Sequence, residues 1–349
     1  MPTSLDLRAG DVVEVLSEAE ILATLDANGE LESLPFMPEM LQYCGRRLTV
    51  YKIANKTCDT INQSGMLKME NAVHLNGVRC NGGGHGGCQA ACLIYWKTAW
   101  LRKVEGAEAD IPVSPAAPAA PAEESKLLPL LTISSRKPPA EDGTEVFRCQ
   151  ATELLRAAPE AMPFKRTSQF VQDVRSGNAT VGATSRTIFV ALYNRAQGLS
   201  TKVLPQRRWI KGGRQWGNLR GTADKTPTVK LGLQPGDMVR IRSKEEVAAT
   251  LNADLLNRGM GFDAEMARFC GRTAKVARRV DQIINEHTGQ MIKMKNPCIV
   301  LENVVCEGVF NLSCPRAITP YWREVWLERI GPSTGQPNGR TTATTKVGE

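Results

Sequence analysis

The sequence predicts a mainly β fold with helical insertions, built as two tandem small barrels joined by a helical middle region. Two observations lead to this prediction. The chain repeats itself at an offset of 226 residues, and each copy contains several short segments of strand pattern separated by turn residues and short helical stretches. A chain of 349 residues is also long enough for more than one domain.

The repeat spans residues 5–104 and 231–330. So many identities at one offset do not arise by chance, and the offset is restored after a small shift near the Met-Leu-Lys-Met and Met-Ile-Lys-Met segments. The paired residues include Gly10, Asp11 and Val13 with Gly236, Asp237 and Val239; Phe36, Glu39, Met40 and Cys44 with Phe262, Glu265, Met266 and Cys270; and Cys80, Cys88, Tyr95, Trp96 and Trp100 with Cys306, Cys314, Tyr321, Trp322 and Trp326.

The elements of the first copy follow from its pattern. Residues 11–16 alternate as a strand, and Ser17 with Glu20 forms a capping box that begins a helix over 18–26. A second short helix is expected over 38–43, ending at Gly45. Residues 47–54 predict another strand and residues 66–78 a pair of short strands. Residues 92–104 have helical periodicity, with Trp96 and Trp100 one turn apart on one face.

Two strand patterns carry a resemblance to a known class of domain. The opening Leu7-Arg-Ala-Gly-Asp-Val-Val-Glu-Val, followed by Cys44-Gly-Arg-Arg-Leu-Thr-Val-Tyr-Lys, resembles the SH3-like barrels of KOW-type and other translation or transcription proteins. The second copy repeats the opening as Leu233-Gln-Pro-Gly-Asp-Met-Val-Arg-Ile. Such modules also look like parts of hypothetical bacterial proteins. The resemblance implies two tandem SH3-like barrels.

Three further segments lie outside the copies. Residues 105–144 contain the run Pro112-Val-Ser-Pro-Ala-Ala-Pro-Ala-Ala-Pro, which predicts a semi-rigid linker. Residues 145–230 are expected to form a helical and basic middle region, with helices over 149–158, 168–175 and 184–196. The apolar stripe of Ile188, Phe189, Ala191 and Leu192 is expected to pack in a core, with a membrane surface as the alternative. Residues 331–349 are expected to be a disordered tail.

The stretch from Lys202 to Lys230 is a candidate nucleic-acid contact. It holds eight basic residues against one acidic residue, so its charge favours a phosphate-bearing partner. Arginine together with tryptophan suits phosphate contact and base stacking. The alternative is a solvated basic loop that its tryptophans anchor to a barrel. The candidate contacts are Arg207, Arg208, Trp209, Lys211, Arg214 and Trp216.

Composition places the chain among cytoplasmic proteins. No apolar run is long enough to span a bilayer, and the N-terminus lacks the apolar region of a secretory signal. In a reducing compartment the ten cysteines are better explained as metal ligands, reactive thiols or buried small residues than as disulfides. The formal net charge of +8 permits an acidic partner, either nucleic acid or protein, without requiring one.

The segment from Cys80 to Cys92 carries the clearest sign of a site. Four soft ligand side chains fall within thirteen residues, and five glycines between them let the backbone turn tightly around a bound centre. The shared residues Cys44, Cys80 and Cys88 recur as Cys270, Cys306 and Cys314. The predicted ligands of copy one are Cys44, Cys80, Cys88 and Cys92, with His85 or Cys58 as further candidates; copy two has Cys270, Cys306 and Cys314, with Cys298 or His287 as a fourth.

The ligand set leaves the metal open between zinc and an iron–sulfur cluster. Tetrahedral Cys₄ or Cys₃His sites suit zinc, whereas four thiolates and a glycine-rich loop suit a four-iron cluster. The spacing between Cys80, Cys88 and Cys92 matches neither paired zinc knuckles nor a standard ferredoxin run. Single thiols such as Cys58, Cys149 and Cys298 are also commonly buried as small apolar residues.

Three functions remain open from the sequence. The first is a metal-binding cytoplasmic protein whose barrels or basic stretch bind nucleic acid or another protein. The second is an iron–sulfur or zinc enzyme, or an accessory protein of a biosynthetic pathway, that uses an open three-cysteine centre and acts on a small molecule. The third is a scaffold without metal, in which the cysteines are only buried. The sequence contains no Walker loop, G-x-G-x-x-G or H-E-x-x-H pattern that would indicate another chemistry.

Overall fold

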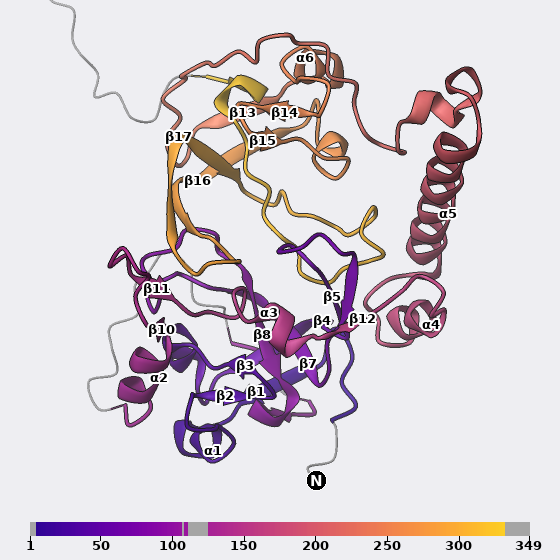
Figure 1. Ribbon diagram of the computed structural model, residues 1–349. Helices are drawn as coiled ribbons and strands as arrows, with labels where there is room; N and C mark the ends of the chain where they lie inside the picture. The colour runs from indigo at the N-terminus through magenta and orange to yellow at the C-terminus, as the bar shows by residue number, and fades with distance from the viewer. Residues whose placement is uncertain (1–4, 107, 111–124, 332–349) are drawn as a thin grey trace, which may run out of the picture.

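The structure is a computed structural model that describes residues 5–106, 108–110 and 125–331. Within these residues the chain is mainly β with a few helices. Figure 1 shows two β-rich modules, one from each sequence copy, with helix α5 standing beside both. We call residues 5–104 module one and residues 231–330 module two.

Module one is built on an antiparallel sheet with the strand order β8-β7-β4-β1-β9. The helix after β1 begins with the predicted capping box of Ser17 and Glu20. The strands of the sheet are β1 (Val12–Val15), β4 (Arg47–Ile53), β7 (Ala72–Arg79), β8 (Leu93–Lys97) and β9 (Leu101–Lys103). The inserted elements are α1 (Glu18–Leu22), β2 (Glu30–Leu31), β3 (Leu34–Pro35), η1 (Pro38–Tyr43), β5 (Lys56–Cys58), β6 (Met66–Lys68) and η2 (Thr98–Trp100).

Module two repeats this arrangement with the strand order β17-β16-β13-β18. Its main difference is a longer hairpin, because β16 and β17 pair from Val276 and Leu301 as far as Ile284 and Met291. In module one the same stretch is divided into two strand pairs, β4 with β7 and β5 with β6. The elements are β13 (Met238–Ile241), α6 (Lys244–Ala248), β14 (Leu256–Asn257), β15 (Met260–Gly261), η5 (Met266–Arg268), β16 (Thr273–Ile284), β17 (Met291–Leu301), η6 (Glu324–Trp326) and β18 (Leu327–Arg329).

Two fully buried tryptophans form the centre of each core. Trp96 and Trp100 meet Phe36 edge to face, with ring centroids 6.0 and 5.1 Å away. Trp100 Nε1 donates to Thr24 Oγ1 at 3.0 Å, and Trp326 Nε1 donates to Thr250 in the same way.

The predicted helix over residues 92–104 is wrong, because the segment forms β8, one 3₁₀ turn and β9. A strand followed by a tight turn reproduces the four-residue spacing of the two tryptophans.

The middle region packs largely on module one. Its side chain Gln150 accepts a hydrogen bond from Tyr95 N and donates one to Tyr95 O, so it pairs with β8 as a neighbouring strand would. Strand β12 extends the β5-β6 pair. The elements are α2 (Leu128–Ser134), β10 (Arg136–Lys137), β11 (Val146–Phe147), α3 (Leu154–Ala157), β12 (Glu160–Ala161), α4 (Ser168–Arg175), α5 (Val181–Val203), η3 (Gln206–Arg208) and η4 (Ile210–Gly213).

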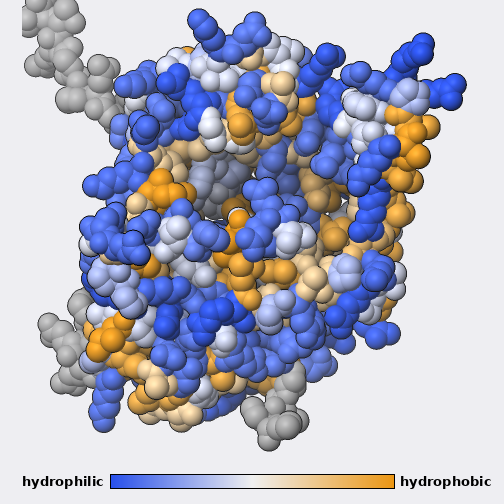
Figure 2. Space-filling model, viewed as in Figure 1, coloured by the Kyte–Doolittle hydropathy of each residue, from blue (hydrophilic) through white to orange (hydrophobic). Residues whose placement is uncertain are grey.

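Two of the expected segments differ from the structure. Residues 105–144 are not a linker throughout, because α2 lies within them and Leu127 and Leu131 are fully buried. The run from Pro112 and the tail after Gly331 lie outside the described residues. The apolar stripe on α5 is not core either. Phe189 is 57% and Leu192 51% exposed, and hydrophobic residues follow the outer edge of the helix in Figure 2.

The two modules contact each other through their cysteine loops, residues 80–92 in module one and 306–318 in module two. Each loop lies against the other module. Ile284 N in β16 donates to Cys88 Sγ at 3.3 Å, and Cys58 N in β5 donates to Cys314 Sγ at 3.2 Å. Cys58 and Ile284 are equivalent positions in the two copies, as are Cys88 and Cys314. The interface is therefore reciprocal, because Cys88 and Cys314 each accept a backbone N–H from the opposite module.

No helix in the described part of the chain is long and apolar enough to cross a membrane.

A buried histidine predicts how acid destabilises module one. His74 is inaccessible to solvent, and burial lowers its pKa to about 3 from 6.5. Between these values the unfolded chain binds a proton that the folded chain does not, so stability falls with decreasing pH by up to about 1.4 kcal/mol per unit. Module two has Val300 at the equivalent position. We expect His74→Val to remove this loss in urea unfolding between pH 7 and 4.5, and an unchanged difference between the two pH values would contradict it.

A second prediction concerns the tight turn of the cysteine loop. Gly82 has a φ of +74°, and a Cβ there would lie 2.0 Å from Cys88 O. We expect Gly82→Ala to destabilise the protein by more than about 4 kcal/mol in chemical unfolding, because the backbone has to move. Gly10 is the matched control, since its φ is +96° and its Cβ would meet nothing within 4 Å. Gly10→Ala should cost only about 1–2 kcal/mol, and equal losses in the two variants would refute this view of the loop.

Candidate metal centre

The cysteine loop of module one turns back on itself and places Cys80 beside His85. Cys80 N donates to Cys92 O at 2.8 Å, and this bond closes the loop at its base. His85 N and Gly87 N both donate to Gly82 O, at 3.1 and 3.0 Å. Because the chain folds around Gly82 in this way, the thiol and the imidazole point to the same place.

The third member of the group comes from a distant part of the sequence. Glu39 lies in the short 3₁₀ helix η1, directly after Pro38, and its side chain is only 2% exposed. A Cβ at Gly84 would stand 2.7 Å from Glu39 Oε2. The absence of a side chain at Gly84 therefore lets the cysteine loop lie directly against η1 and its carboxylate.

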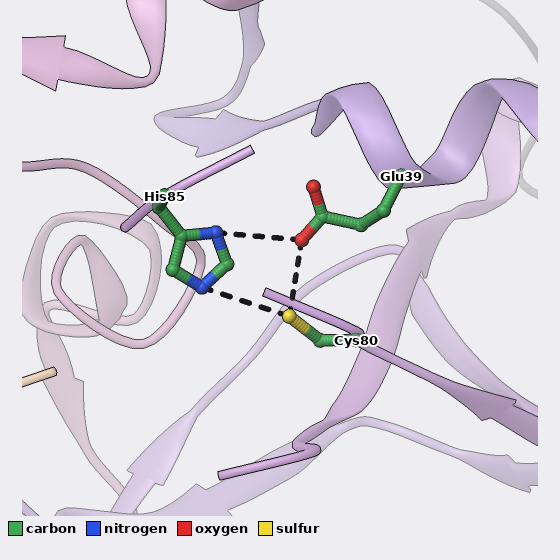
Figure 3. A group of neighbouring side chains, drawn as sticks. All are labelled: Glu39, Cys80 and His85. Carbon is green, nitrogen blue, oxygen red and sulfur yellow. Dashed lines mark hydrogen bonds and ion pairs between the residues drawn. The ribbon is translucent and has the colours of Figure 1, made fainter. Parts of the chain in front are cut away.

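Glu39, Cys80 and His85 form a closed triangle of potential ligand atoms (Figure 3). Cys80 Sγ lies 3.0 Å from Glu39 Oε1 and 3.6 Å from His85 Nε2. His85 Nδ1 lies 3.4 Å from the same carboxylate oxygen. Ligands around a tetrahedral zinc ion at normal bond lengths are about 3.3–3.5 Å apart. One ion can bind only one of the two imidazole nitrogens, and one ligand atom from each side chain already lies within 4.8 Å of the other two.

Burial leaves this group with polar atoms that the protein does not satisfy. Glu39 Oε2 and His85 Nδ1 are buried without a hydrogen-bond partner. Burial, together with the Glu39 charge, raises the pKa of the Cys80 thiol well above 9.0, and burial lowers the pKa of His85. A cation would reverse the shift at Cys80, because a metal favours the thiolate. The chemistry of the group therefore fits a divalent ion.

The geometry of these three side chains can also be compared with that of a catalytic triad that uses no metal. His85 presents Nε2 to the thiol and Nδ1 to the carboxylate, which is the order of a thiol, imidazole and acid relay. That chemistry needs a thiolate beside a protonated imidazole. Here the raised pKa of Cys80 and the lowered pKa of His85 favour the neutral pair instead. The direct contact of Glu39 with the sulfur also fits ligands that converge on one point.

The group faces a cavity of about 390 Å³ at the interface of the two modules. Module one contributes the three side chains and its cysteine loop, the middle region contributes Cys149 to Ala151, and module two contributes the β16–β17 turn and its own cysteine loop. The lining is mostly apolar, with Arg316, Glu286 and two tyrosines among its polar members. A cavity of this kind suits a small molecule. The cavity exists only because the modules dock.

In module two the residues equivalent to Glu39 and His85 do not form a ligand group. The equivalent carboxylate, Glu265, forms an ion pair with Arg268 at 3.1 Å. Glu265 also accepts a hydrogen bond from Phe310 N at 2.9 Å. Asn311 replaces the histidine and Gln42 of module one becomes Arg268. In module two the carboxylate is therefore paired with Arg268, and among the described residues only module one has a complete ligand group.

The structure brings together only part of the ligand set that the sequence predicts. Within the described ranges, Glu39, Cys80 and His85 are the only three potential ligands whose atoms lie within 4.8 Å of one another. Cys88 and Cys92 line the same cavity, as does Cys149, but they do not join this group. Cys58 lies beside Cys314 in an apolar cluster.

The recurring cysteines have structural explanations that the repeat did not reveal. Cys44 and Cys270 follow the 3₁₀ helices and pack against the two cores, so no ion is shared with Cys80 or Cys306. Cys314, like Cys88, accepts a backbone N–H across the interface. Cys298 is fully buried against Val280 and Val300. Among the described residues, neither Cys44, Cys80 and Cys88 nor Cys270, Cys306 and Cys314 form a group within 4.8 Å, and metal binding by these cysteines stays a prediction.

Sequence reasoning missed Glu39 because nothing near it in the chain marks it as a ligand. It is one of several paired residues of the repeat, and its role depends on a loop that follows about forty residues later. The one available signal was the exchange of Gln42 for Arg268, which introduces a charge beside Glu265 in module two only.

The basic stretch offers charge but little free aromatic surface. Trp209 Nε1 donates to Leu204 O, and Trp216 packs against Tyr193 with ring centroids 5.0 Å apart. Lys211 lies over the Trp216 ring. The two tryptophans thus anchor the stretch to α5 rather than to a barrel. Binding of nucleic acid through Arg207, Arg208, Lys211 and Arg214 stays a prediction.

Comparisons of the whole chain with models of protein families, with curated proteins and with solved structures gave no match in any of the three. The identification of the site therefore depends on its own geometry and chemistry.

Proposed function

We propose that this chain is a zinc-dependent enzyme acting on a small molecule, with Glu39, Cys80 and His85 as the ligands of one metal ion. The observation that carries the proposal is the convergence of these three side chains on the wall of one cavity between the modules. Catalytic zinc sites characteristically have three protein ligands and keep a fourth position for water or substrate. A structural site would have four.

The donor set favours zinc over other ions. One thiolate, one imidazole and one carboxylate combine soft, intermediate and hard ligands, and zinc accepts all three. Calcium and magnesium prefer oxygen ligands alone. A zinc ion in such a site lowers the pKa of bound water and polarises a carbonyl or similar group. The residues of this chain hold the ion, and Gly82 N supports the Cys80 sulfur with a hydrogen bond at 3.3 Å.

The lining of the cavity constrains the substrate. Ile61, Leu93, Ile283 and Ile318 make much of the wall apolar, so the molecule bound there is small and mainly apolar. Arg316, which is only 4% exposed, lies in the same wall and supplies one cationic contact. Glu286 Oε1 lies 3.7 Å from Arg316 Nη2 in the same wall, so a compound with an apolar body and a polar group fits this combination.

The remaining expectations from the sequence belong to this proposal as well. We propose SH3-like barrels for the two modules, on the strand patterns that begin with Gly-Asp in each copy and on the matching strand orders. We also keep the cytoplasm as the compartment, since ten free cysteines suit a reducing environment. A role in binding nucleic acid or protein would reside in the basic stretch, away from the metal ligands.

One observation supports an iron–sulfur cluster as a second candidate. Four cysteines, Cys80, Cys88, Cys92 and Cys149, line the same cavity. Iron–sulfur clusters use four thiolates and are larger than a single ion, so their ligands can stand further apart than those of zinc. Backbone N–H groups already point at two of the sulfurs, at Gly82 and at Ile284. This candidate does not use Glu39 or His85.

Metal analysis of the purified full-length protein tests the two candidates. We expect one zinc per chain and a colourless solution. His85→Asn places the residue of module two at this position and should lower zinc affinity at least about 100-fold, because a direct ligand is lost. His287→Asn is the matched control, since His287 lines the cavity outside the ligand group, and it should retain the zinc.

Two outcomes would reject the zinc assignment. Iron with absorbance near 400 nm, lost in Cys149→Ser and kept in His85→Asn, would establish the cluster instead. Zinc that is bound equally well by wild type and by His85→Asn would show that the ligands lie elsewhere.

A further inference from the structure

A second pair of functional groups meets at the interface between the modules. Cys58 in β5 and Cys314 in the cysteine loop of module two are far apart in the sequence, yet Cys58 N donates to Cys314 Sγ at 3.2 Å. The Cys314 sulfur therefore lies directly beside the residue that carries the Cys58 thiol. They lie in a small apolar cluster with Met66, Met162 and Leu312. Neither side chain belongs to the proposed metal centre.

The opposite half of the interface serves as an internal control. There Ile284 occupies the position of Cys58, Cys88 that of Cys314 and Ala90 that of Arg316. The N–H to sulfur bond is present in both halves, at 3.3 and 3.2 Å, so docking needs only one sulfur. The second thiol and the arginine occur only in the half with Cys58. The second thiol is not required for the bond between N–H and sulfur and calls for another explanation.

Arg316 places a positive charge next to this pair. Its Nη1 donates to Cys58 O at 3.2 Å and to Thr60 Oγ1 at 2.9 Å, and its side chain is 5% exposed. Its Nη2 lies 3.7 Å from Glu286 Oε1. The Cys314 hydrogen bond and then Arg316 lower the pKa of Cys58 to about 6, although burial opposes this. Burial raises the pKa of Cys314. The two shifts favour a thiolate on Cys58 and a protonated thiol on Cys314.

We propose that Cys58 and Cys314 form a redox-active dithiol that hydroperoxides oxidise to a disulfide between the two modules. The Cys58 thiolate attacks one peroxide oxygen, so that an S–O bond forms, the O–O bond breaks and the leaving oxygen takes a proton. The Cys314 sulfur then attacks the sulfenic sulfur of Cys58. The S–S bond forms, and the hydroxyl leaves as water with the proton of the Cys314 thiol.

The surroundings supply access for the oxidant. Cys58 is partly exposed, and Thr60, Ile61 and Arg316 beside it line the cavity at the interface. The backbone N–H of Cys58 contacts the Cys314 sulfur at 3.2 Å, so the Cys58 side chain starts next to the sulfur with which it would bond. The site is therefore selective for one pair among ten cysteines.

Peptide mapping of the full-length protein after treatment with hydrogen peroxide tests the proposal. We expect a Cys58–Cys314 disulfide, loss of two thiols per chain and full recovery with dithiothreitol. Cys58→Ile introduces the residue of the opposite half and should abolish the cross-link while the fold is kept. Cys88→Ser is the matched control, because Cys88 has the same backbone contact without a partner thiol, and it should leave the cross-link unchanged.

The rate of oxidation at two pH values tests the role of Arg316. Arg316→Ala copies Ala90 and should slow oxidation at pH 7 at least about fivefold, because less of Cys58 is ionised. At pH 10 the two rates should converge, since the thiol is then ionised in both proteins. Failure of wild-type protein to form the Cys58–Cys314 disulfide, or a cross-link that forms equally fast between other cysteines, would overturn the proposal. A purely structural role for Arg316 would give the same rate ratio at both pH values.

Discussion

The reciprocal bond between a backbone N–H of one module and a cysteine sulfur of the other is the contact on which the rest of the structure depends. Ile284 donates to Cys88, and Cys58 donates to Cys314. These contacts hold each cysteine loop against the opposite module, and the cavity forms between the loops. Glu39, Cys80 and His85 line this cavity together with residues of module two.

Duplication allowed the two halves to diverge around a shared interface. Module one keeps a carboxylate without an internal cation, whereas module two pairs Glu265 with Arg268 and replaces the histidine by Asn311. Conversely, the half of the interface that contains Cys314 gained a second thiol and Arg316. Each half thus carries one chemical specialisation, and neither carries both. This division of labour is consistent with one protein in which both modules are required.

Much of the fold could be predicted from the sequence, because strands, capping boxes and repeats are encoded by local patterns. The capping box at Ser17 and the helix from Ser168 to Arg175 are examples. The helix expected around Trp96 was wrong, since a strand and a turn give the same spacing of buried rings. The site was harder. Recurrence of Cys88 as Cys314 looked like ligand conservation between the copies but arises from docking, and Glu39 reaches Cys80 only through the tertiary fold.

The central claim is that one ion is held by one sulfur, one imidazole nitrogen and carboxylate oxygen. X-ray absorption at the zinc edge of the purified protein tests it directly, because sulfur and lighter ligands differ in bond length. The account predicts one Zn–S distance near 2.3 Å together with nitrogen and oxygen neighbours near 2.0 Å, about as in known sites. A first shell made of four sulfurs would contradict it, because Glu39 and His85 would then have no part in the centre.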